Sequence, residues 1–146
     1  MLYLDTSFLT PLVKPEPTSE RVARFLARFT DEELAISHWT QVEFSSVLAR
    51  EVRMGRMDAA EAGKATTRFD AIIAESFTVL LPGPEAFNLA RQYIARHESG
   101  LRGGDALHLA IARTHRATAI YSLDRVLIKA GALFGLPVSA GIDLDR

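Results

Sequence analysis

The chain has 146 residues, 48% of them hydrophobic and 24% charged, and its formal net charge is −1. This length and balance suit one compact domain over residues 1–146 and exclude an intrinsically disordered protein. Charged residues cut every apolar stretch before it reaches the roughly 20 residues of a membrane-spanning helix, and the N-terminus lacks the features of a signal peptide. We therefore expect a soluble, cytoplasmic protein with no membrane partner.

Two features of the composition bear on ligands. The absence of Cys excludes disulfides, thiolate nucleophiles and Cys-based zinc or iron–sulfur sites, so any metal must be held by oxygen or imidazole. The 17 basic residues comprise 14 Arg and 3 Lys, and the planar Arg guanidinium suits phosphate and carboxylate oxygens. A GC-rich genome produces the same bias, so composition alone leaves phosphate binding open.

Short apolar runs alternate with helical patterns along the whole chain. The first run ends in Asp5-Thr6-Ser7, which indicates a strand followed directly by the start of a helix. In chain order we then expect, after the strand at 2–4, a helix at 18–29, a strand at 34–37, helices at 39–54 and 58–75, a strand at 77–81, helices at 85–97 and 105–115, a strand at 119–122, a short helix at 124–130 and an edge strand at 137–138.

This alternation is typical of the α/β class, in which helices cover both faces of a parallel sheet. The pattern predicts three layers, with a central parallel sheet of four to five strands flanked by helices. No internal repeat or shift in composition marks a second domain.

Acidic residues follow the predicted strands. Asp5 ends the first strand, Asp124 follows the fourth, Glu43 lies in the first two turns of the helix after the second, and Asp105 begins a helix after a Gly-rich loop. Ligands of open parallel sheets bind at the carboxyl ends of the strands, so these four acids are expected at one edge of the sheet. Taken singly, each also has an ordinary structural explanation, such as a helix cap or a solvated helix surface.

Several other chemistries do not match the spacing. A haloacid dehalogenase-type phosphatase needs a second Asp where Ser7 stands, and a receiver domain needs a Lys after a late strand. No P-loop, dinucleotide-binding or Gly-x-Ser-x-Gly motif occurs. The four His residues lack zinc-hydrolase spacing. His108 lies three positions after Asp105 and could touch a substrate or a carboxylate, but a packing or surface role is expected for all four.

Carboxylates without Cys or paired His suit a hard divalent cation. Mg²⁺ is usually held by one or two carboxylates together with waters and substrate phosphate oxygens. Several neighbouring carboxylates raise one another's pKa unless a cation neutralises them. A bound metal lowers the pKa of a coordinated water and stabilises charge on a phosphodiester. Metal-assisted nuclease chemistry is therefore the interpretation that the acids favour.

Four motifs in this order resemble the PIN-domain ribonucleases, and within them the VapC toxins of type II toxin–antitoxin pairs. The motifs are Leu4-Asp5-Thr6-Ser7, then Ile36-Ser37 with Glu43 in the following helix, then Asp105-Ala-Leu-His-Leu-Ala-Ile-Ala112, and finally Tyr121-Ser-Leu-Asp124. The resemblance spans nearly the whole chain. It implies a PIN-like domain over residues 1–146 and a Mg²⁺- or Mn²⁺-dependent endoribonuclease that uses a metal-activated water.

The resemblance also assigns roles to single residues. Asp5, Glu43, Asp105 and Asp124 correspond to the family's acidic quartet, which is both catalytic and metal-binding. Asp5 and Asp105 are then the direct metal ligands, Glu43 helps to orient the water, and Asp124 contributes to the metal or to its hydrogen-bond shell. Two serines support the site: Ser7 follows the first Asp, and Ser122 stands where many relatives carry Thr.

The partners that the resemblance implies are an RNA substrate, often a tRNA or rRNA loop, a VapB-type antitoxin and a second copy of the chain in a homodimer. Basic residues near the quartet, namely Arg50, Arg53, Arg102 and Arg125, could contact phosphate or simply be solvated. The alternatives are an RNA-processing PIN nuclease that is not a toxin, and a non-catalytic RNA-binding or assembly module, which would usually lack some of the four acids. An unrelated α/β phosphohydrolase of small substrates also stays open, whereas flap-type DNA nucleases are longer.

Overall fold

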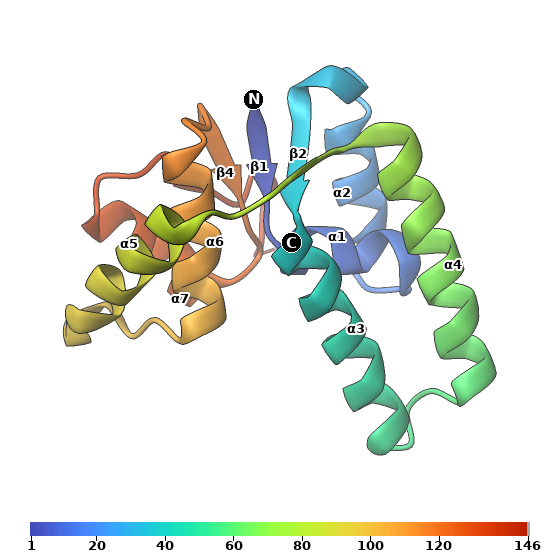
Figure 1. Cartoon of the computed structure of the whole chain (residues 1–146). Coiled ribbons are helices and arrows are strands. Elements are labelled where there is room, and N and C mark those ends of the chain that lie inside the picture. Colours follow the sequence, from blue (N-terminus) through green and yellow to red (C-terminus); the bar gives the residue numbers. More distant parts are fainter. Residues whose placement is uncertain (146) are drawn as a thin grey trace.

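The computed structural model describes residues 1–145 and has a central sheet flanked by helices (Figure 1). Five parallel strands are arranged in the order β3-β2-β1-β4-β5. They are β1 Leu2–Leu4, β2 Leu34–Ser37, β3 Thr78–Leu80, β4 Ala119–Tyr121 and β5 Val138–Ser139. The predicted α/β class with a parallel sheet is confirmed, and residue 146 of the expected domain lies outside the described residues.

Seven α-helices connect the strands within the described residues. They are α1 Thr6–Val13, α2 Ser19–Leu26, α3 His38–Arg53, α4 Ala59–Ser76, α5 Pro84–Ala95, α6 Gly103–Thr114 and α7 Arg125–Leu133, with short 3₁₀ turns at Asp31–Glu33 and His97–Ser99. In the same part of the chain, no helix is long and apolar enough to cross a membrane.

The sheet separates two apolar cores. Tyr3 packs with residues of α5, α6 and α7 on one face, whereas Leu4 packs with residues of α1, α2, α3 and α4 on the other. Successive side chains of a strand point to opposite faces, so β1 contributes to both cores. Figure 1 shows the two groups of helices on either side of the strands. The fold thus has the three layers that the sequence predicts.

The element boundaries differ from the predictions mainly at helix ends. Helix α2 stops at Leu26 rather than near Phe29, because the N–H groups of Arg28 and Phe29 bond to carbonyls three residues back and tighten the turn. Phe29 still packs edge-on against Phe25. Helix α6 begins at Gly103, two residues earlier than expected. The two 3₁₀ turns were not predicted, and β5 is an edge strand as predicted.

Candidate active site

The acids that follow the strands line one hollow at the carboxyl edge of the sheet. Its volume is about 470 Å³. The residues that line it come from five separate segments and are Asp5, Thr6, Ser7, Thr10, Glu16, Glu43, Val47, Asp105, Leu123 and Asp124. The structure therefore brings together all four acids expected from the sequence.

Asp5 is buried between two strand ends and held by two serines. Its side chain is 3% exposed and makes no capping bond to α1, although Asp5 occupies the cap position. The Ser7 hydroxyl donates to Oδ1 at 2.7 Å and the Ser122 hydroxyl donates to Oδ2 at 3.1 Å. Each hydroxyl in turn accepts a backbone N–H, from Leu123 and Asp124 respectively. Both serines therefore fix the Asp5 carboxylate and join β1 to the end of β4.

The surroundings of Asp5 disfavour its negative charge. Burial raises the pKa of Asp5 to about 6, although the positive ring of His108 and the bonds from Ser7 and Ser122 act in the opposite direction. The negative charge of the nearby Glu43 carboxylate makes a smaller contribution to this rise in the pKa. A cation placed beside the Asp5 carboxylate would stabilise its negative charge.

Asp105 lies in the first turn of α6 and is half-buried. Burial, followed by the charges of Asp124 and Glu43, raises the pKa of Asp105 above its usual range, while His108 and Arg102 partly offset this effect. The acids therefore act on one another through space, which is the repulsion that the sequence analysis expects of a convergent group.

Gly104 leaves room for two side chains of α3. A Cβ at this position would lie 2.8 Å from Oε2 of Glu43 and 3.2 Å from the Trp39 ring. No side chain larger than hydrogen fits there without displacing one of them. The glycine therefore leaves space for the Glu43 carboxylate beside the first turn of α6.

Glu43 is paired with His108. The His108 Nε2 lies 2.7 Å from Oε1 of Glu43, and the ring is fully buried. Burial opposes the charge of both groups, but the Tyr3 oxygen and the bond with Glu43 raise the pKa of His108 to about 10. His108 likewise lowers the pKa of Glu43 against the effect of burial. His108 is packed, as expected, but it also contacts a carboxylate of the hollow.

Asp124 caps helix α7. Its Oδ1 accepts the backbone N–H groups of Val126 at 2.8 Å and Leu127 at 3.3 Å. The structural explanation considered for this residue is thus confirmed, and Asp124 lines the hollow as well. Capping fixes the carboxylate group at the mouth of the hollow.

Glu16, which was not predicted as a site residue, is a fifth acid that lines the hollow from the α1–α2 loop. Glu16 lies between Pro15 and Pro17. An acid held between two prolines is a signal of a stiffened loop, but nothing local indicates that the loop turns toward the acids.

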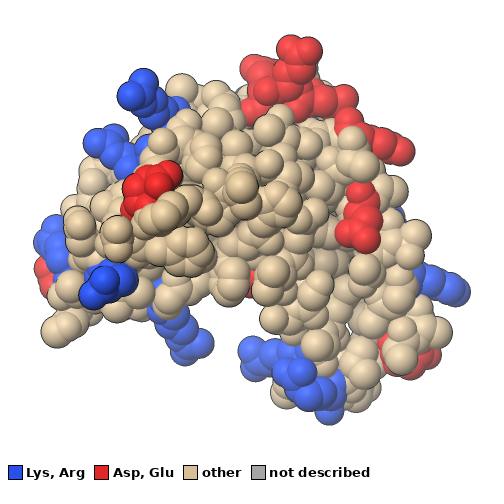
Figure 2. Space-filling view, in the orientation of Figure 1, with Lys and Arg blue, Asp and Glu red and all other residues tan. Residues whose placement is uncertain are grey.

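The four basic candidates are exposed. Arg50 and Arg53 lie near the end of α3, Arg102 lowers the pKa of Asp105, and Arg125 donates to Asp145 at 2.6 Å. Figure 2 shows a notch between the two halves of the molecule, with basic side chains on both sides. Basic groups therefore surround a notch in an otherwise nearly neutral molecule.

The donor set suits a divalent cation that the protein holds with few ligands. Among residues 1–145, no three His, Asp or Glu side chains form a ready-made metal-binding group. Asp5 and Asp105 nevertheless have raised pKa values and line the same hollow. Mg²⁺ commonly takes only one or two carboxylates and completes its shell with water and substrate oxygens. These residues fit such a cation.

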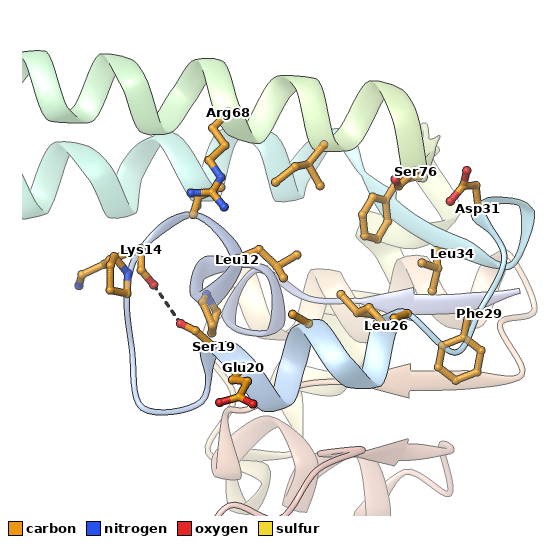
Figure 3. Close-up of a pocket in the computed structure, with 17 residues that line it drawn as sticks. Leu12, Lys14, Ser19, Glu20, Leu26, Phe29, Asp31, Leu34, Arg68 and Ser76 are labelled. Carbon is orange, nitrogen blue, oxygen red and sulfur yellow. Dashed lines mark hydrogen bonds between the residues drawn. The ribbon is translucent and has the colours of Figure 1, made fainter.

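A second hollow lies away from the acids, where α1 ends between α2 and α4 (Figure 3). Its volume is about 650 Å³. Leu12, Leu26, Phe29 and Ile72 contribute to its largely apolar wall, and we call it the apolar groove. Its few charged groups lie apart from one another in Figure 3, so it offers no converging set for catalysis.

Comparisons with known proteins agree with this geometry. A family model described as PIN domain matches residues 2–133. No curated protein matches the chain.

Among solved structures, the chain is similar to Mycobacterium tuberculosis VapC20, a sarcin–ricin loop cleaving toxin, with 20% identity, TM-score 0.73 and 90% of this chain and 95% of that chain covered. It is similar to PAE2754 of Pyrobaculum aerophilum, with 25% identity, TM-score 0.65 and 99% and 83% covered. A chain of a Klebsiella pneumoniae toxin–antitoxin complex has 19% identity, TM-score 0.66 and 98% and 99% covered.

Proposed function

The chain belongs to the PIN domain family, and on this basis we propose that it is a metal-dependent endoribonuclease and the toxin of a toxin–antitoxin pair. The observation that carries the proposal is the convergence of Asp5, Glu43, Asp105 and Asp124, from four separate segments, on one hollow at the carboxyl edge of the sheet. All four acids are present, which argues against a non-catalytic RNA-binding or assembly module.

In this proposal Asp5 and Asp105 hold Mg²⁺ or Mn²⁺, and Asp124 contributes at the mouth of the hollow. When bound, the cation supplies Lewis-acid chemistry by polarising the scissile phosphate and activating the attacking water. Ser7 and Ser122 keep the Asp5 carboxylate in place. Glu43, kept ionised by His108, accepts a hydrogen bond from the water and orients it toward phosphorus. Attack then breaks the P–O3′ bond and leaves a 5′-phosphate and a 3′-hydroxyl.

We propose single-stranded or looped RNA, in tRNA or rRNA, as the substrate. A site at a sheet edge cannot read the bases of an A-form RNA helix, because they lie in a deep, narrow groove. Unpaired nucleotides are therefore the ones that can reach the carboxylates. The structurally similar VapC20 is a toxin that cleaves the sarcin–ricin loop, which supports this substrate class. With a net charge of −1, RNA binding should depend on the cation rather than on a broad basic surface.

RNA cleavage by the purified chain tests the catalytic proposal. Cleavage should require Mg²⁺ or Mn²⁺, stop with EDTA, and disappear in Asp5→Asn and Asp105→Asn. Asp70→Asn is the matched control, because Asp70 is an exposed acid on α4 that does not line the hollow. Undiminished cleavage in EDTA would exclude the metal mechanism. Hydrolysis of a chromogenic phosphoester without any cleavage of RNA would indicate a small-molecule phosphohydrolase.

The proposed partners are a VapB-type antitoxin and a second copy of the chain, with residues 1–146 acting as one domain in the cytoplasm. The similar Klebsiella pneumoniae chain comes from a toxin–antitoxin complex. An apolar groove that the described chain leaves open is the type of surface that proteins use to bind one another. Co-expression with a small neighbouring open reading frame should suppress toxicity and yield a complex. A non-toxin processing nuclease would be harmless when expressed and would have no such neighbour.

A further inference from the structure

A line of buried polar side chains runs beneath the acidic hollow. The Ser37 hydroxyl lies 3.0 Å from the Tyr3 hydroxyl, which lies 2.8 Å from Nδ1 of His108. Nε2 of His108 then lies 2.7 Å from Oε1 of Glu43. Ser37, Tyr3 and His108 are each 0% exposed. The line therefore connects β1 and the end of β2 with α6 and finishes at Glu43, the one of these four residues that lines the hollow.

The hydrogen bonds fix a single orientation of the His108 ring. A half-turn of the imidazole would exchange each ring nitrogen for a carbon, and the bonds to Tyr3 and Glu43 would both be lost. The Tyr3 hydroxyl bonds to Nδ1 on one side and to the Ser37 hydroxyl on the other, so its own position is fixed by two buried partners. Tyr3 therefore orients the ring that contacts Glu43.

One oxygen of the Glu43 carboxylate is held by a buried group. Oε1 bonds to Nε2 of His108 at 2.7 Å. A Glu side chain on a helix surface otherwise samples many rotamers, and ordering it costs conformational entropy. His108 therefore orders the Glu43 carboxylate before any ligand arrives.

Polar groups in an apolar core are costly unless they are bonded. An apolar side chain would fill the space of the His108 ring without that requirement, so packing alone does not explain an imidazole at this position. The feature that the imidazole adds is the bond to a carboxylate of the hollow.

We propose that His108 is a positioning residue, which holds the Glu43 carboxylate in the orientation that the reaction needs, with Tyr3 fixing the ring of His108. This inference rests on the proposed function of Glu43. Groups that orient the residues of a metal site typically contribute 10- to 100-fold to activity or metal affinity.

Steady-state RNA cleavage tests the inference with three variants. In His108→Leu, kcat should fall by about 10- to 100-fold, while KM changes by less than about twofold. His108→Gln retains an N–H donor toward Glu43 and should recover part of the loss. Tyr3→Phe removes only the hydroxyl and should lower kcat less. The control is Tyr93→Phe, because Tyr93 is a buried tyrosine of the same apolar core and lies away from the hollow.

A double-mutant cycle separates positioning from general stability. If His108 acts through Glu43, His108→Leu should cause no further loss of kcat in a Glu43→Gln background. Independent, multiplying losses would overturn the inference. If His108→Leu does not fold, the same cycle with Tyr3→Phe decides, since that change leaves the volume of the core almost intact.

NMR of the imidazole N–H protons gives a readout that does not need activity. The His108 Nε2–H resonance should be slow to exchange and should shift in Glu43→Gln but not in Asp70→Asn. If the wild-type protein cleaves RNA but the His108 resonance is unchanged in Glu43→Gln, the positioning role is overturned and the proposed function stands. If the resonance shifts as expected but the wild-type protein cleaves no RNA, the Glu43–His108 pairing is supported and the proposed function is contradicted.

Discussion

The acidic hollow and the apolar groove share a loop but differ in the groups that they expose. Lys14 and Pro15 line the groove, whereas Glu16 lines the hollow. The hollow holds carboxylates whose charge is disfavoured by burial and by neighbouring acids, and the groove leaves apolar side chains without a cover. Each region is therefore less stable alone than with a ligand of matching chemistry, a cation in one case and a protein surface in the other.

The largest effect is expected in the hollow. Asp5→Asn keeps the volume of the side chain but removes the charge that the cation needs, so RNA cleavage should fall by about 100-fold or more. The groove should be unaffected, and binding of the antitoxin should stay at the wild-type level. A loss of antitoxin binding in this variant would show that the two regions are not independent.

The pH dependence of stability provides the second test. The pKa of Asp5 in the folded state is about 6 and exceeds its ordinary value of 3.8, so the native state binds more protons than the unfolded state in this range. Without metal, the free energy of unfolding should therefore fall as the pH rises from about 4 to about 6 and beyond, by up to about 3 kcal/mol.

Urea titrations across this range measure the effect. In Asp5→Asn the Asp5 contribution to the slope should be absent, so that the variant is more stable than the wild type at pH 7. Adding Mg²⁺ or Mn²⁺ should raise the free energy of unfolding of the wild type again at this pH. Equal slopes for the two proteins would mean that folding does not raise the pKa of Asp5.

The groove should respond to a change that leaves the hollow intact. Ala23 is an exposed residue of α2 that lines the groove. Ala23→Glu places a charge there and should weaken antitoxin binding by about 10-fold, or about 1.4 kcal/mol, with RNA cleavage unchanged. Ala71→Glu on the exposed side of α4 is the control, since Ala71 does not line the groove. Calorimetry with the antitoxin distinguishes the two variants.

The smallest effect separates the two roles of Asp124. Asp124→Ala removes the cap of α7 and should lower the free energy of unfolding by about 1 kcal/mol, whereas Asp124→Asn retains a capping oxygen and should cost less. Asp58 caps α4 by accepting the N–H of Glu61 at 2.7 Å, away from the hollow. Asp58→Ala should therefore lower stability similarly without reducing cleavage. Full activity in Asp124→Asn would limit this residue to capping.

The sequence predicted those parts of the molecule that follow from local patterns. The apolar run before Asp5 and the following Thr6-Ser7 are enough to predict a strand and a helix start. The rule that ligands bind at the carboxyl ends of parallel strands is enough to expect the acids at one edge. Parallel pairing then brought Asp5 and Ser122 together across 117 positions of the chain.

The remaining features depend on contacts between distant elements. Glu43 and His108 are 65 positions apart, and neither helix pattern indicates that their side chains meet. Glu16 reaches the hollow because the α1–α2 loop turns toward it, which the surrounding prolines do not specify. The start of α6 at Gly103 is likewise not indicated by propensity, because Gly is a poor helix former.

The two adjacent glycines at the start of α6 should therefore tolerate mutation very differently. A Cβ at Gly103 would meet nothing within 4 Å, whereas one at Gly104 would collide with the Glu43 carboxylate. In a saturation library selected for toxicity, position 103 should accept many residues, whereas larger residues at position 104 should be depleted because they displace the Glu43 carboxylate. One hydrogen atom in place of a methyl group thus leaves the space that the Glu43 carboxylate occupies beside the helix that carries Asp105.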